Sequence, residues 1–179
     1  GTGMRGEEFR KKTYLQLSMM EGDDQIAVAK ELGKLSYVDK DRIGIWGWSY
    51  GGFMSSTCLF KGDGVFKMAI AVAPVSNWRY YDNIYTERYM RTPKENPDGY
   101  DNNAPEKMDK NMQGKFLLIH GTADDNVHFQ NSVTLTQELI QANKEFESEY
   151  YPDRAHGISG GNSKYHLYNR MTNFILTNL

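Results

Sequence analysis

The stretch Arg42-Ile-Gly-Ile-Trp-Gly-Trp-Ser-Tyr-Gly-Gly52 decides how this chain folds. Its apolar first half is too short for an ordinary helix and predicts a buried strand. A G-x-S-x-G pattern follows at 47–51. A strand that turns sharply into a helix strains the residue at the turn, and neighbouring glycines relieve the crowding and leave the Ser49 hydroxyl exposed. The stretch therefore predicts either a nucleophile at a strand–helix turn or a glycine-rich turn without chemistry.

The rest of the chain alternates short apolar runs with amphipathic patterns. Strands are expected at 43–48, 66–75, 116–121 and 146–151. Helices are expected from Asp23-Asp24, at 51–60, at 130–142 and near the C-terminus, where one face carries Leu167, Met171, Phe174 and Ile175. The segment 92–114 is poor in apolar residues and is expected to be a surface excursion. This alternation predicts a parallel sheet covered by helices, in one α/β domain over residues 1–179.

Three chemically reactive residue types each follow a predicted strand. Ser49 follows the first strand, Asp124 the third and His156 the fourth. The carboxyl ends of parallel strands share one rim of the sheet, where ligands bind. The chain order serine, aspartate, histidine is that of α/β-hydrolases. The sequence therefore predicts a Ser-Asp-His catalytic triad.

His156 is the best candidate for the general base among the four histidines. It lies in a turn just after the fourth strand, and Gly157 is expected to allow close approach. His120 ends a strand and is expected to be structural, with its ring held by a backbone partner. His128 and His166 are expected in a loop and on a helix surface.

The orienting acid has three candidates. Asp124 and Asp125 are adjacent, and Asp153 lies close to His156 in sequence. Short turns rarely let their own side chains face each other, which disfavours Asp153. A residue near a strand end is held more firmly than the residues after it, so Asp124 is favoured over Asp125.

Composition limits the classes of function. The chain has 179 residues, of which 39% are hydrophobic and 25% charged, as expected of one globular domain. A net charge of −2 gives no basic surface for nucleic acid or anionic membrane. The single Cys58 excludes an intrachain disulfide and offers no metal cluster. We expect no cofactor and no metal.

An aromatic group follows the second strand. Trp78, Tyr81 and Tyr85 have the spacing of one helix face. Core packing is one interpretation of this group. A flat hydrophobic pocket beside Ser49, of the shape that a proline ring would fill, is the other.

Several longer motifs resemble one family. They are G-W-S-Y-G-G at 47–52, V-F-K-M-A-I-A-V-A-P-V-S-N-W-R-Y-Y at 65–81, Y-T-E-R-Y-M at 85–90, H-G-T-A-D-D-N-V-H-F-Q at 120–130 and H-G at 156–157. Together they resemble the prolyl oligopeptidase family of serine peptidases, and within it the dipeptidyl peptidase IV branch. The resemblance implies the C-terminal part of an α/β-hydrolase domain that removes Xaa-Pro, and less readily Xaa-Ala, dipeptides from free N-termini.

The resemblance also implies roles for individual residues. Ser49, Asp124 and His156 would form the triad, and the backbone N–H of Tyr50 would donate to the oxyanion. Asn126 would help to hold the penultimate carbonyl of the substrate. The proline pocket would be lined by Val75, Trp78, Tyr81, Tyr85 and Val127. This assignment reverses the core-packing interpretation of the aromatic group.

Other parts of the family's site have no counterpart in this sequence. A second oxyanion donor, a tyrosine side chain, would lie upstream, and the glutamates that bind the substrate's amine would lie on an N-terminal β-propeller. The chain alone is therefore expected to be a poorly active fragment. The resemblance further implies a homodimer and a periplasmic, secreted or cell-surface location.

Two alternatives remain open. An esterase, thioesterase or acylaminoacyl hydrolase could use the same triad, although the aromatic pocket and Asn126 argue against it. A non-catalytic binding domain could keep the fold, but it would have no need of all three triad residues. An assay panel of Xaa-Pro and simple ester substrates separates these alternatives.

Overall fold

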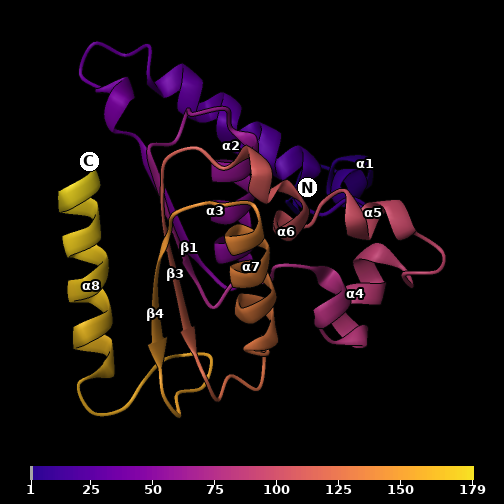
Figure 1. Ribbon diagram of the computed structural model, residues 1–179. Coiled ribbons are helices and arrows are strands. Elements are labelled where there is room, and N and C mark those ends of the chain that lie inside the picture. Colours follow the sequence, from indigo (N-terminus) through magenta and orange to yellow (C-terminus); the bar gives the residue numbers. More distant parts are fainter. Residues whose placement is uncertain (1) are drawn as a thin grey trace.

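A computed structural model describes residues 2–179 and shows helices on both faces of a parallel sheet (Figure 1). The four strands are β1 (Gly44–Trp48), β2 (Met68–Val72), β3 (Lys115–Gly121) and β4 (Glu147–Tyr151), in spatial order β1-β2-β3-β4. The longer helices are α2 (Met19–Leu32), α3 (Tyr50–Lys61), α4 (Asn83–Met90), α7 (Gln130–Gln141) and α8 (Ser163–Asn178). The shorter helices are α1 (Glu7–Arg10), η1 (Lys11–Thr13), η2 (Lys40–Arg42), η3 (Trp78–Tyr80), α5 (Pro97–Asp101), α6 (Pro105–Met108) and η4 (Asp109–Asn111).

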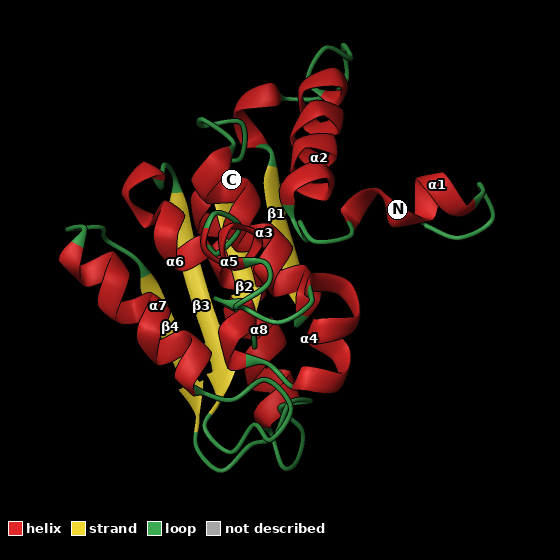
Figure 2. Cartoon of the chain, turned by 90° about the vertical axis from the view of Figure 1, so that its right-hand side faces the viewer, coloured by secondary structure: helices red, strands yellow, loops and turns green. Residues whose placement is uncertain are grey.

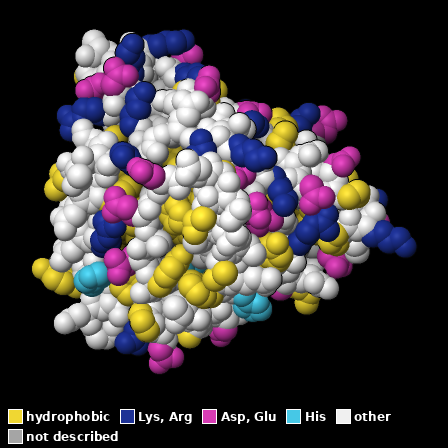
Figure 3. Space-filling view, viewed as in Figure 1, with side chains coloured by type: hydrophobic (Ala, Val, Ile, Leu, Met, Phe, Trp, Pro, Cys, Tyr) yellow, Lys and Arg dark blue, Asp and Glu magenta, His cyan; other side chains and the backbone are white. Residues whose placement is uncertain are grey.

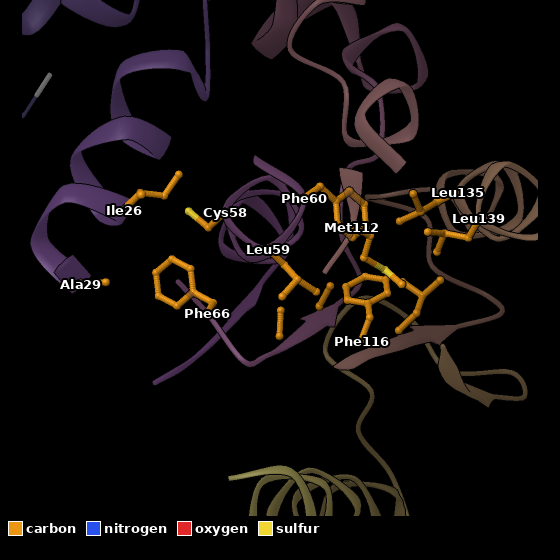
Figure 4. Packing of buried hydrophobic residues seen from close by; sticks show 13 residues of the cluster. Ile26, Ala29, Cys58, Leu59, Phe60, Phe66, Met112, Phe116, Leu135 and Leu139 are labelled. Atoms are coloured by element: carbon orange, nitrogen blue, oxygen red, sulfur yellow. The ribbon is translucent and has the colours of Figure 1, made fainter. Parts of the chain in front are cut away.

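The predicted parallel α/β sheet is confirmed, and its two faces carry different cores. Helix α8 covers one face alone, whereas α2, α3 and α7 lie over the other (Figures 1 and 2). In β2 the side chains alternate: Ile70 faces the α8 side, whereas Ala69 faces the α3 side. Figure 4 shows the α3-side core, in which Phe60 packs edge-on against Phe116 with ring centroids 5.3 Å apart. Burying one such side chain contributes roughly 1.5–3 kcal/mol.

The polar segment 92–114 does not fit the expected surface excursion. Tyr100, Ala104 and Met112 are buried in it. The segment folds back because hydrogen bonds fix its backbone: the Tyr100 hydroxyl donates to the carbonyl of Arg91 at 2.6 Å, and the Asn96 amide donates to backbone carbonyls on two other segments. Few apolar residues therefore suffice to anchor it.

Helix α2 also differs from expectation at its start. It begins at Met19 and not at Asp23, so Glu21 is the acidic residue of its first turn. The expected C-terminal helix is confirmed, with Leu167, Met171 and Phe174 buried and Ile175 partly buried. Within residues 2–179, no helix combines the length and the apolar character needed to cross a membrane.

Candidate active site

Ser49 sits at the sharp turn between β1 and α3. Its backbone has φ 60° and ψ −117°, a strained conformation for a residue with a side chain. Its N–H donates to the carbonyl of Val72 at 2.8 Å, which ties the turn to β2. The following helix starts at Tyr50, so its first N–H groups lie beside the serine. This geometry is that of the predicted strand–helix elbow.

Two glycines make the elbow possible. A Cβ on Gly47 would lie 2.2 Å from the carbonyl oxygen of Gly51, and one on Gly52 would lie 2.9 Å from that of Val72. A Cβ on Gly51 would meet no atom within 4 Å. The close approach of strand and helix therefore requires Gly47 and Gly52, whereas Gly51 meets no such restriction.

Asp124 is the buried acid of the site. Its side chain is fully buried, and one oxygen, Oδ1, accepts the backbone N–H groups of Asn126 and Val127 at 2.9 and 3.0 Å. The other oxygen, Oδ2, lies 2.7 Å from Nδ1 of His156. Burial by itself would raise the pKa of Asp124, but hydrogen bonds from His120, His156 and the Asn126 N–H together hold that pKa well below its usual range. Asp124 is therefore an ionised partner for a histidine.

The competing acids take no part in this pair. Asp125 and Asp153 are both exposed, and the carboxylate that accepts from Nδ1 of His156 is that of Asp124. The geometry agrees with the preference for the residue nearest the strand end.

The loop that carries His156 packs tightly on the neighbouring loop, but through a different glycine than expected. Nothing lies nearer than 3.9 Å to a Cβ built on Gly157. A Cβ on Gly121 would instead lie 2.2 Å from the carbonyl oxygen of Arg154. The Ala123 N–H donates to the same carbonyl at 3.1 Å. Close approach is thus needed at Gly121, where β3 ends against the histidine loop.

Ser49 and His156 come from strands at opposite ends of the sheet order. The indole N–H of Trp48 donates to the carbonyl of His156 at 2.9 Å and so anchors the histidine loop next to the serine. Among residues 2–179, no hydrogen bond joins the Ser49 hydroxyl to the His156 ring. Nucleophile–base contacts in unliganded hydrolases are often longer than in their complexes.

The other histidines lie where the sequence places them. His120 is fully buried, and its Nε2 lies 2.8 Å from the carbonyl of Val127, the expected backbone partner. His128 is exposed in a turn, and His166 is exposed on α8.

The aromatic group is packed together, but not on one helix. Trp78 belongs to η3 and Tyr85 to α4, because Asp82 caps the start of α4 by accepting the Tyr85 N–H at 2.8 Å. The Trp78 and Tyr85 rings stack with centroids 5.6 Å apart. Tyr81 meets both rings edge-on, at 5.8 and 5.4 Å.

The remaining expected pocket residues join this group. Val75 and Val127 are buried in the same cluster as Trp78. The Tyr81 hydroxyl donates to the side-chain oxygen of Asn126 at 2.6 Å, which links the aromatic wall to the acid loop. Tyr81 and Asn126 also line a depression of about 650 Å³ beside the group.

Tyr50 connects the elbow to the aromatic wall. Its ring lies 5.7 Å from that of Trp78, and its hydroxyl donates to Oε1 of Glu21 at 2.6 Å. Burial first, and then the hydrogen bond to Glu21, raise the pKa of Tyr50 far above its usual value, so the hydroxyl stays a donor. The sequence reasoning missed Glu21, and the only signal was an acidic residue near a predicted helix start.

Comparison with known proteins places this geometry in a family. Residues 1–179 match the prolyl oligopeptidase family. The chain is 47% identical over 178 residues to dipeptidyl peptidase 4 of Felis catus, covering 98% of this chain and 23% of that protein. It is 45% identical over 180 residues to prolyl endopeptidase FAP of Mus musculus, again covering 98% of this chain and 23% of the relative.

A solved structure agrees with the fold. The crystal structure of dipeptidyl peptidase 4 from Porphyromonas gingivalis superimposes with a TM-score of 0.96 and is 54% identical, covering 98% of this chain and 25% of that one. The chain therefore spans about a quarter of the length of these relatives. A strained serine elbow, a buried aspartate–histidine pair and a match over the whole sequence lead to one conclusion: the chain belongs to the prolyl oligopeptidase family.

Proposed function

We propose that this chain carries the catalytic triad of a serine peptidase that releases Xaa-Pro, and less readily Xaa-Ala, dipeptides from free N-termini. The 2.7 Å contact between His156 Nδ1 and the buried carboxylate of Asp124 carries the proposal. A histidine oriented in this way beside a strained serine has the arrangement that acyl transfer needs.

The roles in the proposed reaction follow from the protonation that the contacts impose. An ionised Asp124 accepts only, so the proton between it and His156 belongs on Nδ1. Nε2 of His156 is then free of a proton and can take the one on Ser49 Oγ as the serine attacks the scissile carbonyl. The same proton then passes to the leaving amine, and water later repeats the sequence on the acyl-enzyme.

The oxyanion and the specificity pocket use the neighbouring elements. The N–H of Tyr50, at the start of α3, would donate to the oxyanion, and the helix dipole there favours negative charge. Trp78 and Tyr85 stack, Tyr81 stands edge-on to both, and together the three rings form an apolar wall suited to a proline ring. Asn126 stands at the rim of this wall to hold the substrate's penultimate carbonyl.

The proposed activity depends on parts beyond this sequence. By family resemblance, a second oxyanion donor and the acids that bind the substrate's amine would come from an upstream tyrosine and a β-propeller. We expect the chain by itself to hydrolyse peptides poorly. By the same resemblance, we propose a periplasmic, secreted or cell-surface location.

A homodimer is part of the proposal. Helices α7 and α8 flank the edge strand β4 and expose large apolar side chains, among them Ile140 at 55% and Leu176 at 76%. Figure 3 shows hydrophobic side chains gathered over the region of β4 and α7. Sedimentation of the complete protein measures whether it is a dimer, and Leu176→Glu should shift the equilibrium from dimer toward monomer.

The test of the triad uses Ser49→Ala in the complete protein. Turnover of Gly-Pro-nitroanilide should fall to the residual rate that binding and oxyanion contacts supply, roughly 10³–10⁴ over water, while substrate binding is retained. A panel of simple esters should show weaker turnover than the Xaa-Pro substrate. Turnover like that of the wild type in the variant would remove Ser49 from the reaction.

An endopeptidase is the second candidate, because a relative 45% identical to this chain is named prolyl endopeptidase FAP. Comparing Gly-Pro-nitroanilide with its N-succinyl derivative decides between the two. A dipeptidyl peptidase requires the free amine, whereas an endopeptidase accepts the blocked substrate.

A further inference from the structure

His120 lies beneath the acid loop and contacts three elements at once. It is the second-last residue of β3 and is fully buried. Its Nδ1 lies 2.6 Å from the hydroxyl of Ser132 on α7. Its Nε2 lies 2.8 Å from the carbonyl of Val127 and, as a longer second contact, 3.2 Å from Oδ2 of Asp124. One ring thus joins the strand, the acid loop and the following helix.

The contacts determine where the proton sits on this ring. Both neighbours of Nε2 are acceptors, a carbonyl oxygen and an ionised carboxylate oxygen. Nε2 must therefore carry the proton, and in the neutral ring Nδ1 accepts from the Ser132 hydroxyl. His120 is consequently held with a donor directed at the underside of the acid loop.

This donor completes the surroundings of the Asp124 carboxylate. Oδ1 accepts two backbone N–H groups, whereas Oδ2 faces His156 at 2.7 Å and His120 at 3.2 Å. A buried carboxylate is costly to ionise unless its lone pairs are satisfied. Both imidazole rings contact the same oxygen, Oδ2. The contact with His120 therefore fixes the position of Oδ2 relative to Nδ1 of His156.

The same ring also fixes the part of the loop that would meet substrate. Its hydrogen bond to the Val127 carbonyl holds the segment 124–127, which contains Asn126 and the pocket residue Val127. Phe129 packs edge-on against the ring at 5.6 Å and limits its rotation. Acid and substrate-binding residues are therefore held in place from one point.

We propose that His120 is a positioning residue for the peptidase reaction, which acts through Asp124 and the loop 124–127 and does not touch substrate. The inference rests on the proposed function. It predicts that the ring's Nε2–H matters more than its bulk. In metal sites, partners that orient the metal's ligands from behind change metal affinity or activity by about 10–100-fold when they are removed, and we expect a change of similar size here.

The test compares two substitutions at one position in the complete protein. His120→Leu removes the donor and keeps apolar bulk, and kcat for Gly-Pro-nitroanilide should fall on the order of 10–100-fold. His120→Gln retains an N–H donor near the position of Nε2 and should recover most of that loss. Leu139→Ala, a cavity in α7 away from the loop, is the control for a general loss of stability.

A second measurement does not depend on turnover. The proton shared between His156 Nδ1 and Asp124 should give a low-field proton resonance in the wild type and in His120→Gln, and this resonance should weaken or disappear in His120→Leu. Equal kcat values for the Leu and Gln variants, or an unchanged resonance in His120→Leu, would overturn the positioning role. If the wild-type protein gave the resonance but did not hydrolyse Gly-Pro-nitroanilide, the proposed substrate would be wrong, and the positioning role would still be tested by the resonance.

Discussion

The acid loop (124–127) and the aromatic wall (Trp78, Tyr81 and Tyr85) meet at Asn126 but are held in different ways. Around Asp124, both carboxylate oxygens accept contacts from backbone and imidazole donors. Around the wall, three buried side-chain atoms have no hydrogen-bond partner within the described residues: Glu21 Oε2, Trp78 Nε1 and Thr86 Oγ1. Hydrogen bonds therefore determine the geometry of the loop, whereas ring packing determines that of the wall.

The difference predicts how each region responds to change. Hydrogen bonds to an ionised group are strong and directional, so a change in the loop should act on the chemical step. Ring packing contributes mainly buried apolar area, so a change in the wall should act on the choice of substrate. Substitutions in the two regions should therefore separate kcat effects from specificity effects.

The largest effect is expected for Asp124→Asn. An amide can donate to Nδ1 of His156 and so favours the wrong tautomer, and the equivalent change in a related triad lowers kcat by about 10⁴. Asp125→Asn, one residue further along and exposed, is the matched control and should change kcat little. Steady-state kinetics on Gly-Pro-nitroanilide measure both. If Asp125→Asn lowered kcat more than Asp124→Asn did, Asp125 would be the acid that orients His156.

A smaller and more selective effect is expected for Tyr85→Ala. The wall should lose aromatic contact worth roughly 1.5–3 kcal/mol, and only a substrate with a proline ring would lose it. Turnover of the Xaa-Pro substrate should therefore fall about 10–100-fold, while that of a small ester changes little. Equal losses for both substrates would identify Tyr85 as support for the core.

The same contrast explains what the sequence could and could not predict. The elbow at Ser49 and the choice of Asp124 depend on local patterns and on strand ends, and in the structure Ser49 lies at a strand–helix turn and Asp124 lies 2.7 Å from His156. The role given to Gly157 belongs to Gly121, because the close approach is between loops from two different strands. Tertiary packing, which no local spacing encodes, decides such contacts.

The aromatic wall and its support show the same limit. The spacing of its rings suggested one helix, but the Asp82 cap starts a second one between Trp78 and Tyr85. Glu21 contacts the site from α2, 29 residues before Tyr50, and Ser132 contacts it from α7, 12 residues after His120. Their residue types carry no motif, so sequence reasoning had no means of selecting them.

A third comparison concerns Tyr50, which touches the wall through its ring. Tyr50→Phe keeps the ring against Trp78 but leaves Oε1 of Glu21 without its donor. Because this contact is partly buried, the loss of its donor should cost at most about 1–3 kcal/mol of unfolding free energy. Urea unfolding should show this loss while the preference for Xaa-Pro over ester substrates is retained. Glu21→Gln, which keeps an acceptor for the hydroxyl, should cost less, and a changed substrate preference in Tyr50→Phe would show that the hydroxyl acts in specificity.

The smallest effect concerns acid sensitivity, which the loop should confer and the wall should not. Hydrogen bonds hold the pKa of Asp124 below its unfolded value of about 3.9. A depressed pKa contributes stability that is present above the unfolded pKa and is lost as pH falls toward the folded one. Between pH 5 and pH 3 the unfolded chain takes up a proton at Asp124 that the folded protein does not, so unfolding free energy should fall by at most about 1.4 kcal/mol per pH unit from this group. Urea unfolding at several pH values should therefore give a shallower pH slope for Asp124→Asn than for the wild type. Ser49→Ala removes no ionisable group and should keep the wild-type slope. If Asp124→Asn kept the wild-type slope too, Asp124 would not be a carboxylate that its hydrogen bonds keep ionised in the folded protein. The contrast between the hydrogen-bonded loop and the packed wall would then be wrong.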